Sequence, residues 1–353
     1  MRISPPRRLT LSAAVLAVCL AFLPFLFTAC ERPDDIAISA PTGAHEYLFC
    51  FWNVENFFDD KYDGRTGPGD KEMDGFFANH PDILKLKLDH LSDALLKMNG
   101  GKGPDILAIC EVESVRAAQL LQKALNDRLS DPALHYQHVL MKEITAGRHI
   151  APAILTRLPV VADRTRVHGS RLRILEGRIK VNEHELIVLA SHWTSRLRSE
   201  GGAGRDKYAN QLYGVTNAIY KSNPQADVLI CGDFNDTPED EAVVNRLHAS
   251  GDRKAVVESK ETLRLFNLMA GKDASSFGTH YYSGWAIFDQ IVVSPGMLDG
   301  AGWAVEADSL QPIRTLTKPG DRIGRPWRFG GEKEKGPRGY SDHFPVTVKL
   351  RVQ

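Results

Sequence analysis

The stretch LICGDFNDTPED, residues 229–240, places an apolar run directly before an acid, an amide and a turn. The run predicts a buried strand over residues 227–231, and Pro238 suits the first turn of a following helix. Asp233 and Asn235 lie between the two, where the strand leaves the core. Polar groups at the carboxyl end of a buried strand are common ligand positions, although Asp and Asn also close turns through backbone hydrogen bonds.

Seven further apolar runs predict strands, and several are apolar on both faces, as in a sheet that is covered on each side. These strands are expected over residues 47–52, 105–110, 135–141, 151–156, 185–191, 288–294 and 345–350. Apolar residues spaced three or four apart predict amphipathic helices over residues 84–98, 121–129 (preceded by a cap at Ser114) and 208–219. Strands that alternate with covering helices indicate an α/β domain.

Two segments lack apolar periodicity and are expected to be loops. Residues 59–75 are rich in Gly and Asp, and residues 312–339, here called the basic segment, carry eight Lys or Arg against three Asp or Glu. A solvated surface and a contact with nucleic acid both explain such a charge run. Trp327 and Phe329 would stack on bases in the second case, and they would equally anchor the segment to its own domain.

Polar side chains flank six of the predicted strands. They are Asn53 and Glu55, Glu111 and Glu113, His192, Asp233 and Asn235, Asp289, and the run Ser341, Asp342 and His343. Each alone has an ordinary structural explanation, such as a turn or an acid that faces solvent. Turn chemistry does not readily account for six such groups at strand edges.

This set contains what metal-assisted attack of water on a phosphodiester needs. Carboxylate oxygens suit Mg²⁺, which keeps several waters and takes few protein ligands. An acid and an amide can hold the attacking water in line, and histidines can stabilise the transition state or protonate the leaving oxygen. The pattern therefore predicts a hydrolase with a Mg²⁺ or Mn²⁺ cofactor.

Six motifs carry a resemblance to a known family. They are WNVENFFD (52–59), PDILAICEVES (104–114), ASHWTSR (190–196), LICGDFNDTP (229–238), WAIFDQIVVS (285–294) and YSDHFPV (340–346). With these motifs in this order, the chain resembles the endonuclease/exonuclease/phosphatase superfamily from about Phe49 to Leu350. The resemblance implies a deoxyribonuclease-I-like α/β fold, a four-layer sandwich of two mostly antiparallel β-sheets flanked by helices, with the active site at one edge of the sheets.

The resemblance also implies roles for the catalytic residues. Asp233 would orient or deprotonate the water, and Asn235 would hold water or phosphate. Asp289 would pair with His343. His192 matches the second histidine of the deoxyribonuclease-like members and would protonate the leaving group.

The metal and substrate ligands follow from the same resemblance. Glu111 would be the principal metal ligand, with Asn53 beside the metal or the phosphate and Asp342 near the metal. Arg196 and Arg205 would clamp phosphate, although exposed arginines in a Gly-rich loop are more often solvated.

Two further acids in the motifs have weaker assignments. Glu55 falls where repair endonucleases carry Asp, while other members have no acid there. Its role at the metal is therefore an open alternative. Glu113 is expected to be a local hydrogen-bond partner.

The N-terminus is expected to be a separate targeting segment. Residues 1–29 place three arginines before an apolar run, and the sequence LFTAC at residues 26–30 resembles a bacterial lipobox. Cys30 would then be lipidated and residues 30–45 would form a tether to a catalytic domain at 46–353. An uncleaved membrane anchor is the alternative. Cys50, Cys110 and Cys231 are expected to be buried free thiols.

The sequence supports one leading function and two alternatives. Lys plus Arg and Asp plus Glu both total 44, so no whole-molecule field attracts polyanions. The leading hypothesis is a nuclease held at the extracytoplasmic face of a bacterial membrane, in the outer membrane if the cell has one. The alternatives are a phosphodiesterase or phosphatase for phospholipids or small esters, and a non-catalytic binding module. No protein partner is indicated, and a monomer is expected.

Overall fold

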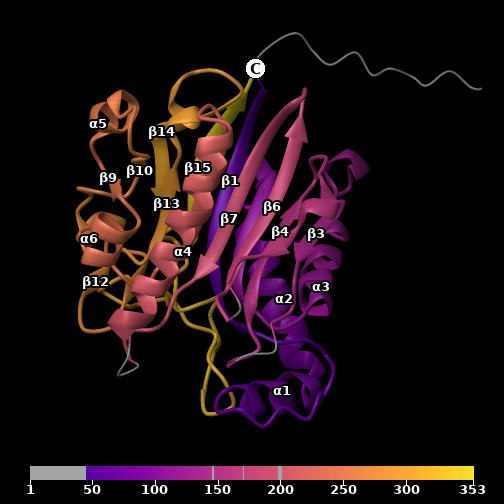
Figure 1. The fold of residues 1–353 in the computed structure, drawn as a ribbon. Coiled ribbons are helices and arrows are strands. Elements are labelled where there is room, and N and C mark those ends of the chain that lie inside the picture. Colours follow the sequence, from indigo (N-terminus) through magenta and orange to yellow (C-terminus); the bar gives the residue numbers. More distant parts are fainter. Residues whose placement is uncertain (1–44, 145–146, 170, 198–200) are drawn as a thin grey trace, which may run out of the picture. The chain divides into compact units, whose positions relative to one another are not determined.

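Two β-sheets pack face to face in the part of the chain that the structure describes, a computed structural model covering residues 45–144, 147–169, 171–197 and 201–353 (Figure 1). The first sheet has the order β14-β15-β1-β2-β4-β3, and only its β1–β2 pair is parallel. Its strands are β14 (Trp303–Pro312), β15 (Val346–Val352), β1 (His45–Phe57), β2 (Ile106–Val112), β4 (Ala151–Thr156) and β3 (His138–Met141).

The second sheet has the order β5-β6-β7-β8-β13-β10-β9, with parallel pairs β7–β8 and β10–β9. Its strands are β5 (Arg166–Val167), β6 (Ile174–Val181), β7 (His184–His192), β8 (Asp227–Asp233), β13 (Asp289–Val293), β10 (Leu265–Asn267) and β9 (Ala249–Ser250). A separate hairpin pairs β11 (His280–Tyr281) with β12 (Trp285–Ala286). Both sheets are mostly antiparallel, as the resemblance implied.

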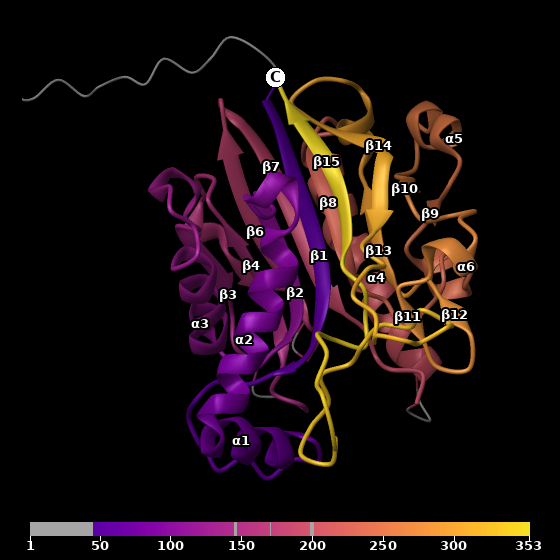
Figure 2. The same ribbon diagram turned by 180° about the vertical axis from the view of Figure 1, so that it is seen from behind.

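Helices cover the outer face of each sheet, which completes the four layers (Figure 2). The first sheet carries α1 (Asp70–Asn79), α2 (Pro81–Leu96) and α3 (Val115–Asn126), and the second carries α4 (Gly201–Ser222). Two short helices, α5 (Arg253–Glu258) and α6 (Ala274–Phe277), lie between strands of the second half of the chain. Helix α3 begins as predicted, because Ser114 Oγ accepts a hydrogen bond from the amide of Ala117 at 3.0 Å.

Alternation along the strands explains the layers. In β1, Phe49 and Phe51 point into the core between the sheets, while Cys50 and Trp52 point to the helices of the first sheet. Cys50, Cys110 and Cys231 are buried free thiols, as predicted. Strands with both faces buried read as continuous apolar runs, so periodicity located them well.

Four expectations about secondary structure were wrong. The helix expected at Pro238 is only a π-helical turn over Ala242–Arg246, and the loop expected over 59–75 contains the start of α1. Strand β3 begins at His138 rather than at residue 135. Strands β6 and β14 and the short strands β5, β9, β10, β11 and β12 were not predicted; β6 buries charged side chains, and β14 lies at the edge of its sheet with apolar side chains on one face only.

The predicted targeting segment lies outside the described residues: this applies to residues 1–29, to the lipidation site Cys30 and to the tether up to residue 44. Among the residues that the structure describes, no helix combines the length and the apolar character that a membrane span requires.

Asp227, the first residue of β8, should make stability depend on pH. It is 7% exposed; Oδ2 accepts a hydrogen bond from the amide of Trp303 at 2.8 Å, and Oδ1 has no partner within the described part of the chain. Burial raises the pKa of Asp227 to about 7, and Asp299 adds to the shift. The folded state therefore binds the extra proton between about pH 4 and pH 7, so stability falls as pH rises through that window.

We expect Asp227→Asn to raise the melting temperature at pH 8 by a few degrees and to have little effect at pH 4. Thermal unfolding at both pH values measures this, with the exposed Asp163→Asn as the matched control. An equal change at both pH values would contradict the pKa assignment.

Candidate active site

Strand direction brings the predicted polar residues to one edge of the sheets. The parallel strands β1 and β2 end there, and so do β7 and β8. Strands β13 and β15 run antiparallel to these neighbours, so Asp289 and the residues before β15 start at the same edge. Asn53 of the first sheet donates a hydrogen bond from Nδ2 to Asp233 Oδ2 of the second at 3.0 Å, which joins the two sheets across the site.

Residues with a left-handed conformation occur at the site ends of two strands. In β2 the register shifts between Ile109 and Val112, and Glu111 takes a left-handed conformation with φ of 65°. Val112 then faces the helices again, so Glu111 is the extra residue that the bulge turns toward the site. Asn235 after β8 is also left-handed, with φ of 51°. Non-glycine residues rarely adopt this conformation, and they tend to cluster at functional sites.

Asn53 presents its amide nitrogen to the site. Nδ2 donates to Asp233 and, at 3.3 Å, to Glu111 Oε1, while Oδ1 accepts from the amide of Glu55 at 3.0 Å. Because only oxygen can accept from that backbone amide, this orientation is determined. It suits a phosphate oxygen better than a cation, which is one of the two roles predicted for Asn53.

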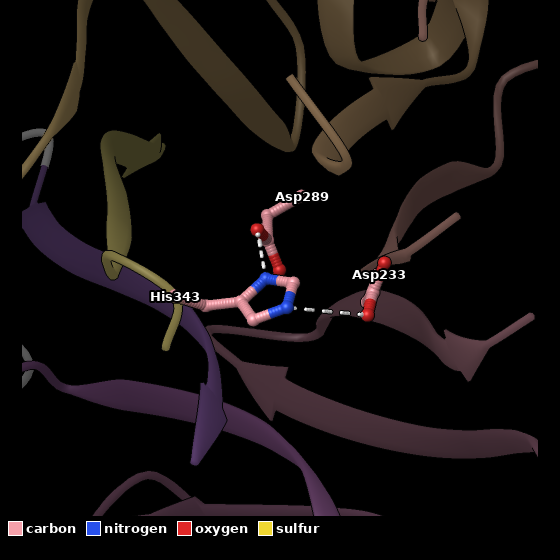
Figure 3. Close-up of side chains that lie close together, drawn as sticks. All are labelled: Asp233, Asp289 and His343. Carbon is pink, nitrogen blue, oxygen red and sulfur yellow. Dashed lines mark hydrogen bonds and ion pairs between the residues drawn. The ribbon is translucent and has the colours of Figure 1, made fainter. Parts of the chain in front are cut away.

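His343, Asp289 and Asp233 form a buried chain of charges (Figure 3). His343 Nδ1 lies 2.7 Å from Asp289 Oδ2, and its Nε2 lies 3.8 Å from Asp233 Oδ2. Burial alone would lower the pKa of His343, but Asp289 and Asp233 outweigh it and hold that pKa well above its ordinary value. Burial raises the pKa of Asp233 to about 7, with His343 opposing and Asp289 adding. His343 is therefore the protonated member, oriented by Asp289.

His192 lies on the opposite side of the same point. Its Nε2 is 3.7 Å from Glu111 Oε1 and 3.8 Å from Asp233 Oδ2. Burial lowers the pKa of His192 to about 4, although Glu111 opposes the shift. His192 is thus a neutral imidazole at pH 7, and His343 is the histidine that carries the extra proton.

Asn235 is held by its neighbours at the end of β8. Its amide donates to Asp233 Oδ1 at 2.9 Å, and its Nδ2 donates to the carbonyl of Trp193 at 3.3 Å. The structure thus places Asn235 in contact with Asp233.

The two predicted phosphate clamps instead pair with acids. Arg196 Nη2 lies 3.1 Å from Asp236 Oδ1 and also contacts Asp240, and Arg205 Nε lies 2.6 Å from Asp236 Oδ1. Arg196 Nε donates to the carbonyl of Asn235 at 2.8 Å. Both arginines therefore support the loop after β8, and a clamping role would require these ion pairs to open.

Glu55 does not face the point where the other acids meet. Its carboxylate is 3% exposed and accepts hydrogen bonds from Arg328, at 2.8 and 3.1 Å, and from the amides of Phe329 and Gly330, at 2.7 and 3.2 Å. This geometry assigns Glu55 to the basic segment rather than to a metal.

Glu113 is a local partner, as expected. It accepts from the amide of Asp59 at 2.9 Å and pairs with Arg65 at 2.6 Å.

The donor set fits a divalent cation. Asp233, Asp289 and His343 offer ligand atoms within 4.8 Å of one another. However, the hydrogen bond between His343 and Asp289 and the raised pKa of His343 make that ring a poor ligand. Glu111 and Asp342 offer hard oxygens, and the pKa of half-buried Asp342 is raised to about 7 by burial and by Glu55. Such crowding of carboxylates is stabilised by a cation, so we favour the predicted ligands Glu111 and Asp342.

The prediction missed several residues beside the site. The amide of Asn56 donates to Glu111 Oε2 at 2.8 Å, and Arg148 contacts Asn56 Oδ1 and lies 3.2 Å from Asp70. The ring of His280 is tilted by 41° to that of His343, with ring centroids 4.6 Å apart, and Lys87 of α2 is fully buried. Asn56 lies in one of the six motifs, so the sequence could have identified it. Arg148, His280 and Lys87 lie outside these motifs.

The basic segment packs on its own domain. Phe329 is 1% exposed and stacks on Phe77 of α1, with centroids 6.1 Å apart, and Trp327 meets Tyr340 edge-on. Phe329 is therefore an anchor, and it does not offer a surface for base stacking.

Comparisons with known proteins agree with this geometry. The sequence profile described as Endonuclease/Exonuclease/phosphatase family matches residues 48–352. No curated protein sequence matches the chain significantly.

Solved structures with low identity share the fold. Truncated TDP2 from Caenorhabditis elegans has a TM-score of 0.51 and 17% identity over 87% of this chain and 98% of its own. An endonuclease/exonuclease/phosphatase family protein from Bacteroides thetaiotaomicron has a TM-score of 0.51 and 15% identity over 88% of this chain and 99% of its own. Sphingomyelinase C from Streptomyces griseocarneus has a TM-score of 0.53 and 13% identity over 86% of this chain and 99% of its own. With its motifs, its two sheets and a profile match over nearly the whole described part, the chain belongs to the endonuclease/exonuclease/phosphatase family of hydrolases.

Proposed function

We propose that this protein is a Mg²⁺- or Mn²⁺-dependent phosphodiesterase, and that its substrate is a nucleic acid. Members of its family are metal-dependent phosphoesterases. The observation that carries the proposal is the meeting of Glu111, Asp233, His192 and the His343–Asp289 pair at one point. The set requires no separate nucleophilic side chain, and in this proposal water is the attacking group.

The residues divide the work as follows. A cation held by Glu111 and Asp342 would polarise the phosphoryl oxygen and offset its developing charge. Asp233, whose pKa of about 7 lies near the working pH, accepts the proton of the attacking water. Protonated His343 gives its proton to the leaving oxygen, and neutral His192 donates a hydrogen bond to the phosphoryl group.

Export and lipid anchoring at Cys30 form part of the same proposal. They rest on the order of charged, apolar and LFTAC residues at the N-terminus. A nuclease tethered in this way would act at the extracytoplasmic face of the membrane.

One observation favours a phospholipid as the second candidate substrate. Leu197, in the loop after β7, is 81% exposed, and Tyr282, in the β11–β12 hairpin, is 76% exposed. Arg196 next to Leu197 bonds Asn235, and His280 of the hairpin forms a β-bridge with His343, so both exposed side chains flank the site. Exposed apolar groups at the rim of a site suit a membrane surface. The fold shared with a sphingomyelinase C is compatible with this candidate.

The test is to incubate the detergent-solubilised protein with supercoiled DNA, single-stranded RNA, bis-p-nitrophenyl phosphate and sphingomyelin vesicles, each with Mg²⁺, Mn²⁺ or EDTA. We expect metal-dependent cleavage of nucleic acid and of the small diester. Asp233→Ala should abolish both while the circular-dichroism spectrum stays unchanged, and the exposed Asp308→Ala should leave both intact.

The other outcomes separate the candidates. Cleavage of vesicles without cleavage of nucleic acid would support the phospholipid candidate. Inactivity on all four substrates would contradict the proposal and favour a binding module.

A further inference from the structure

Lys87 is a fully buried charged side chain that the reaction above does not use. It lies in α2 and its side chain is 0% exposed. Burial lowers the pKa of Lys87 to about 8, while Glu55, Asp342 and Glu111 oppose the shift. The ammonium group is therefore mostly charged at pH 7. Lysine is almost never fully buried unless it is paired, so this position calls for an explanation.

Lys87 contacts two residues, Phe329 and Tyr340, that lie near the two ends of residues 328–343. Its Nζ donates to the carbonyl of Tyr340 at 2.8 Å and lies 4.5 Å from the ring centroid of Phe329. Tyr340 directly precedes Ser341, Asp342 and His343 in the sequence. The ammonium group of Lys87 therefore contacts Phe329 and also Tyr340, the residue directly before Ser341, Asp342 and His343.

Other contacts close residues 328–343 into a fixed loop. The amide of Gly339 donates to the carbonyl of Arg328 at 2.9 Å, and Arg338 Nη1 donates to the carbonyls of Phe329, Gly330 and Gly331 at 3.0 to 3.1 Å. His90, one turn after Lys87 on α2, contacts the carbonyl of Gly339 through Nδ1 at 2.6 Å.

Glu55 holds the opposite end of the same loop. It binds Arg328 and two backbone amides, as described above. Ser341 Oγ donates to the carbonyl of Asn53 at 2.6 Å, and Trp52 Nε1 donates to the carbonyl of His343 at 2.9 Å. Strand β1 and helix α2 thus hold this loop from two sides.

We propose that Lys87 is a positioning residue: its buried ammonium group fixes the main chain at Tyr340 and thereby sets the position of Asp342 and His343. It touches neither substrate nor metal. Small displacements matter at such a site, because a misplacement of about 1 Å can lower a rate about 10²-fold. The activity readout of this inference rests on the proposed function, while a second readout does not.

The test compares Lys87→Met with Lys85→Met in the full-length protein. Lys85 lies on the same helix, and its side chain is 75% exposed with Asp89 as its partner. Met has nearly the length of Lys but no donor or charge. We expect Lys87→Met to lower kcat for bis-p-nitrophenyl phosphate about 10-fold to 100-fold with little change in KM. Lys85→Met should match the wild type.

Hydrogen–deuterium exchange supplies the independent readout. In Lys87→Met the amides of residues 339–343 should exchange at least about tenfold faster, while those of β2 and β8 stay protected. A role in general stability would instead raise exchange in the strands as well. Wild-type exchange at residues 339–343 would overturn the inference, and so would a wild-type kcat in an active enzyme.

A second variant keeps the inference testable if Lys87→Met does not fold. His90→Leu removes a neighbouring contact to the same loop from a half-buried position. It should show a smaller loss of kcat and faster exchange in the same peptide. If the wild type hydrolyses nothing, the proposed function fails, and the exchange result alone decides the role of Lys87.

Discussion

Replacement of Asp289 by Asn is expected to lower kcat for phosphodiester hydrolysis about 10³-fold, with the fold intact. Asp289 accepts the hydrogen bond from His343 Nδ1 at 2.7 Å and is the largest of the charges that raise the pKa of His343, ahead of Asp233 and Asp342. Asn keeps the shape but removes the charge, so the pKa of His343 falls and an ion pair no longer fixes its orientation. Loss of such an orienting carboxylate costs about 10² to 10⁴ in rate in comparable acid–base systems.

The measurement is kcat with bis-p-nitrophenyl phosphate at saturating Mg²⁺ or Mn²⁺, together with the circular-dichroism spectrum. Asp308→Asn, an exposed change in β14, serves as the matched control and should retain full activity. An NMR titration of His343 should show a lower pKa in Asp289→Asn than in the wild type. A kcat near the wild-type value would show that Asp289 does not orient the catalytic histidine.

Replacement of Glu176 by Gln is expected to destabilise the protein by about 3 kcal/mol. Glu176 in β6 is 0% exposed and binds Arg166 at 3.0 and 3.1 Å, Arg178 at 2.6 Å and His168 at 2.6 Å. Gln removes the fully buried counter-charge of Arg178, whose side chain is only 6% exposed, and leaves it with the more exposed Glu185 as a carboxylate partner. Urea denaturation at pH 7.5 measures the free energy of unfolding.

The same network determines the sign of a pH effect. Burial would raise the pKa of Glu176, but hydrogen bonds from His168, Arg166 and Arg178 outweigh it and hold that pKa far below its usual range. The contribution of Glu176 is therefore present above about pH 4.3, the value in the unfolded chain, and is lost as the pH falls below it. The difference between Glu176→Gln and the wild type should shrink below pH 4.

The control for this network is Glu183→Gln. Glu183 is exposed and pairs with Lys180 at the surface, so its replacement should leave the free energy of unfolding nearly unchanged. Equal effects of the two variants at pH 7.5 would contradict a stabilising role for the buried network.

The fold was accessible from the sequence because most strands carry the signal on which periodicity depends. Runs such as residues 151–156 are buried on both faces and coincide with β4. Strand β6 was not predicted because it buries Glu176 and Arg178 as a pair of opposite charges. The pattern of apolar residues gives no information about such pairing. Helix α1 was not predicted because its Gly- and Asp-rich sequence is typical of a loop.

The candidate site was accessible in part. The structure brings Asn53, Glu111, Asp233 and His343 together, and these residues all lie in motifs at strand ends. The Glu55 carboxylate is instead bound by Arg328, which is 273 residues away in the chain. A contact between residues so far apart in the chain cannot be predicted from the local sequence pattern.

By itself the sequence determined which residue types end the strands, and hence the family, the hydrolytic chemistry and the identity of most candidate site residues. Only the tertiary structure decided their directions and charges. The bulge at Glu111 reverses strict alternation, and the proton on His343 rather than His192 follows from two buried carboxylates beside one ring. Both depend on contacts between strands far apart in the chain, because burial and electrostatic coupling act through space.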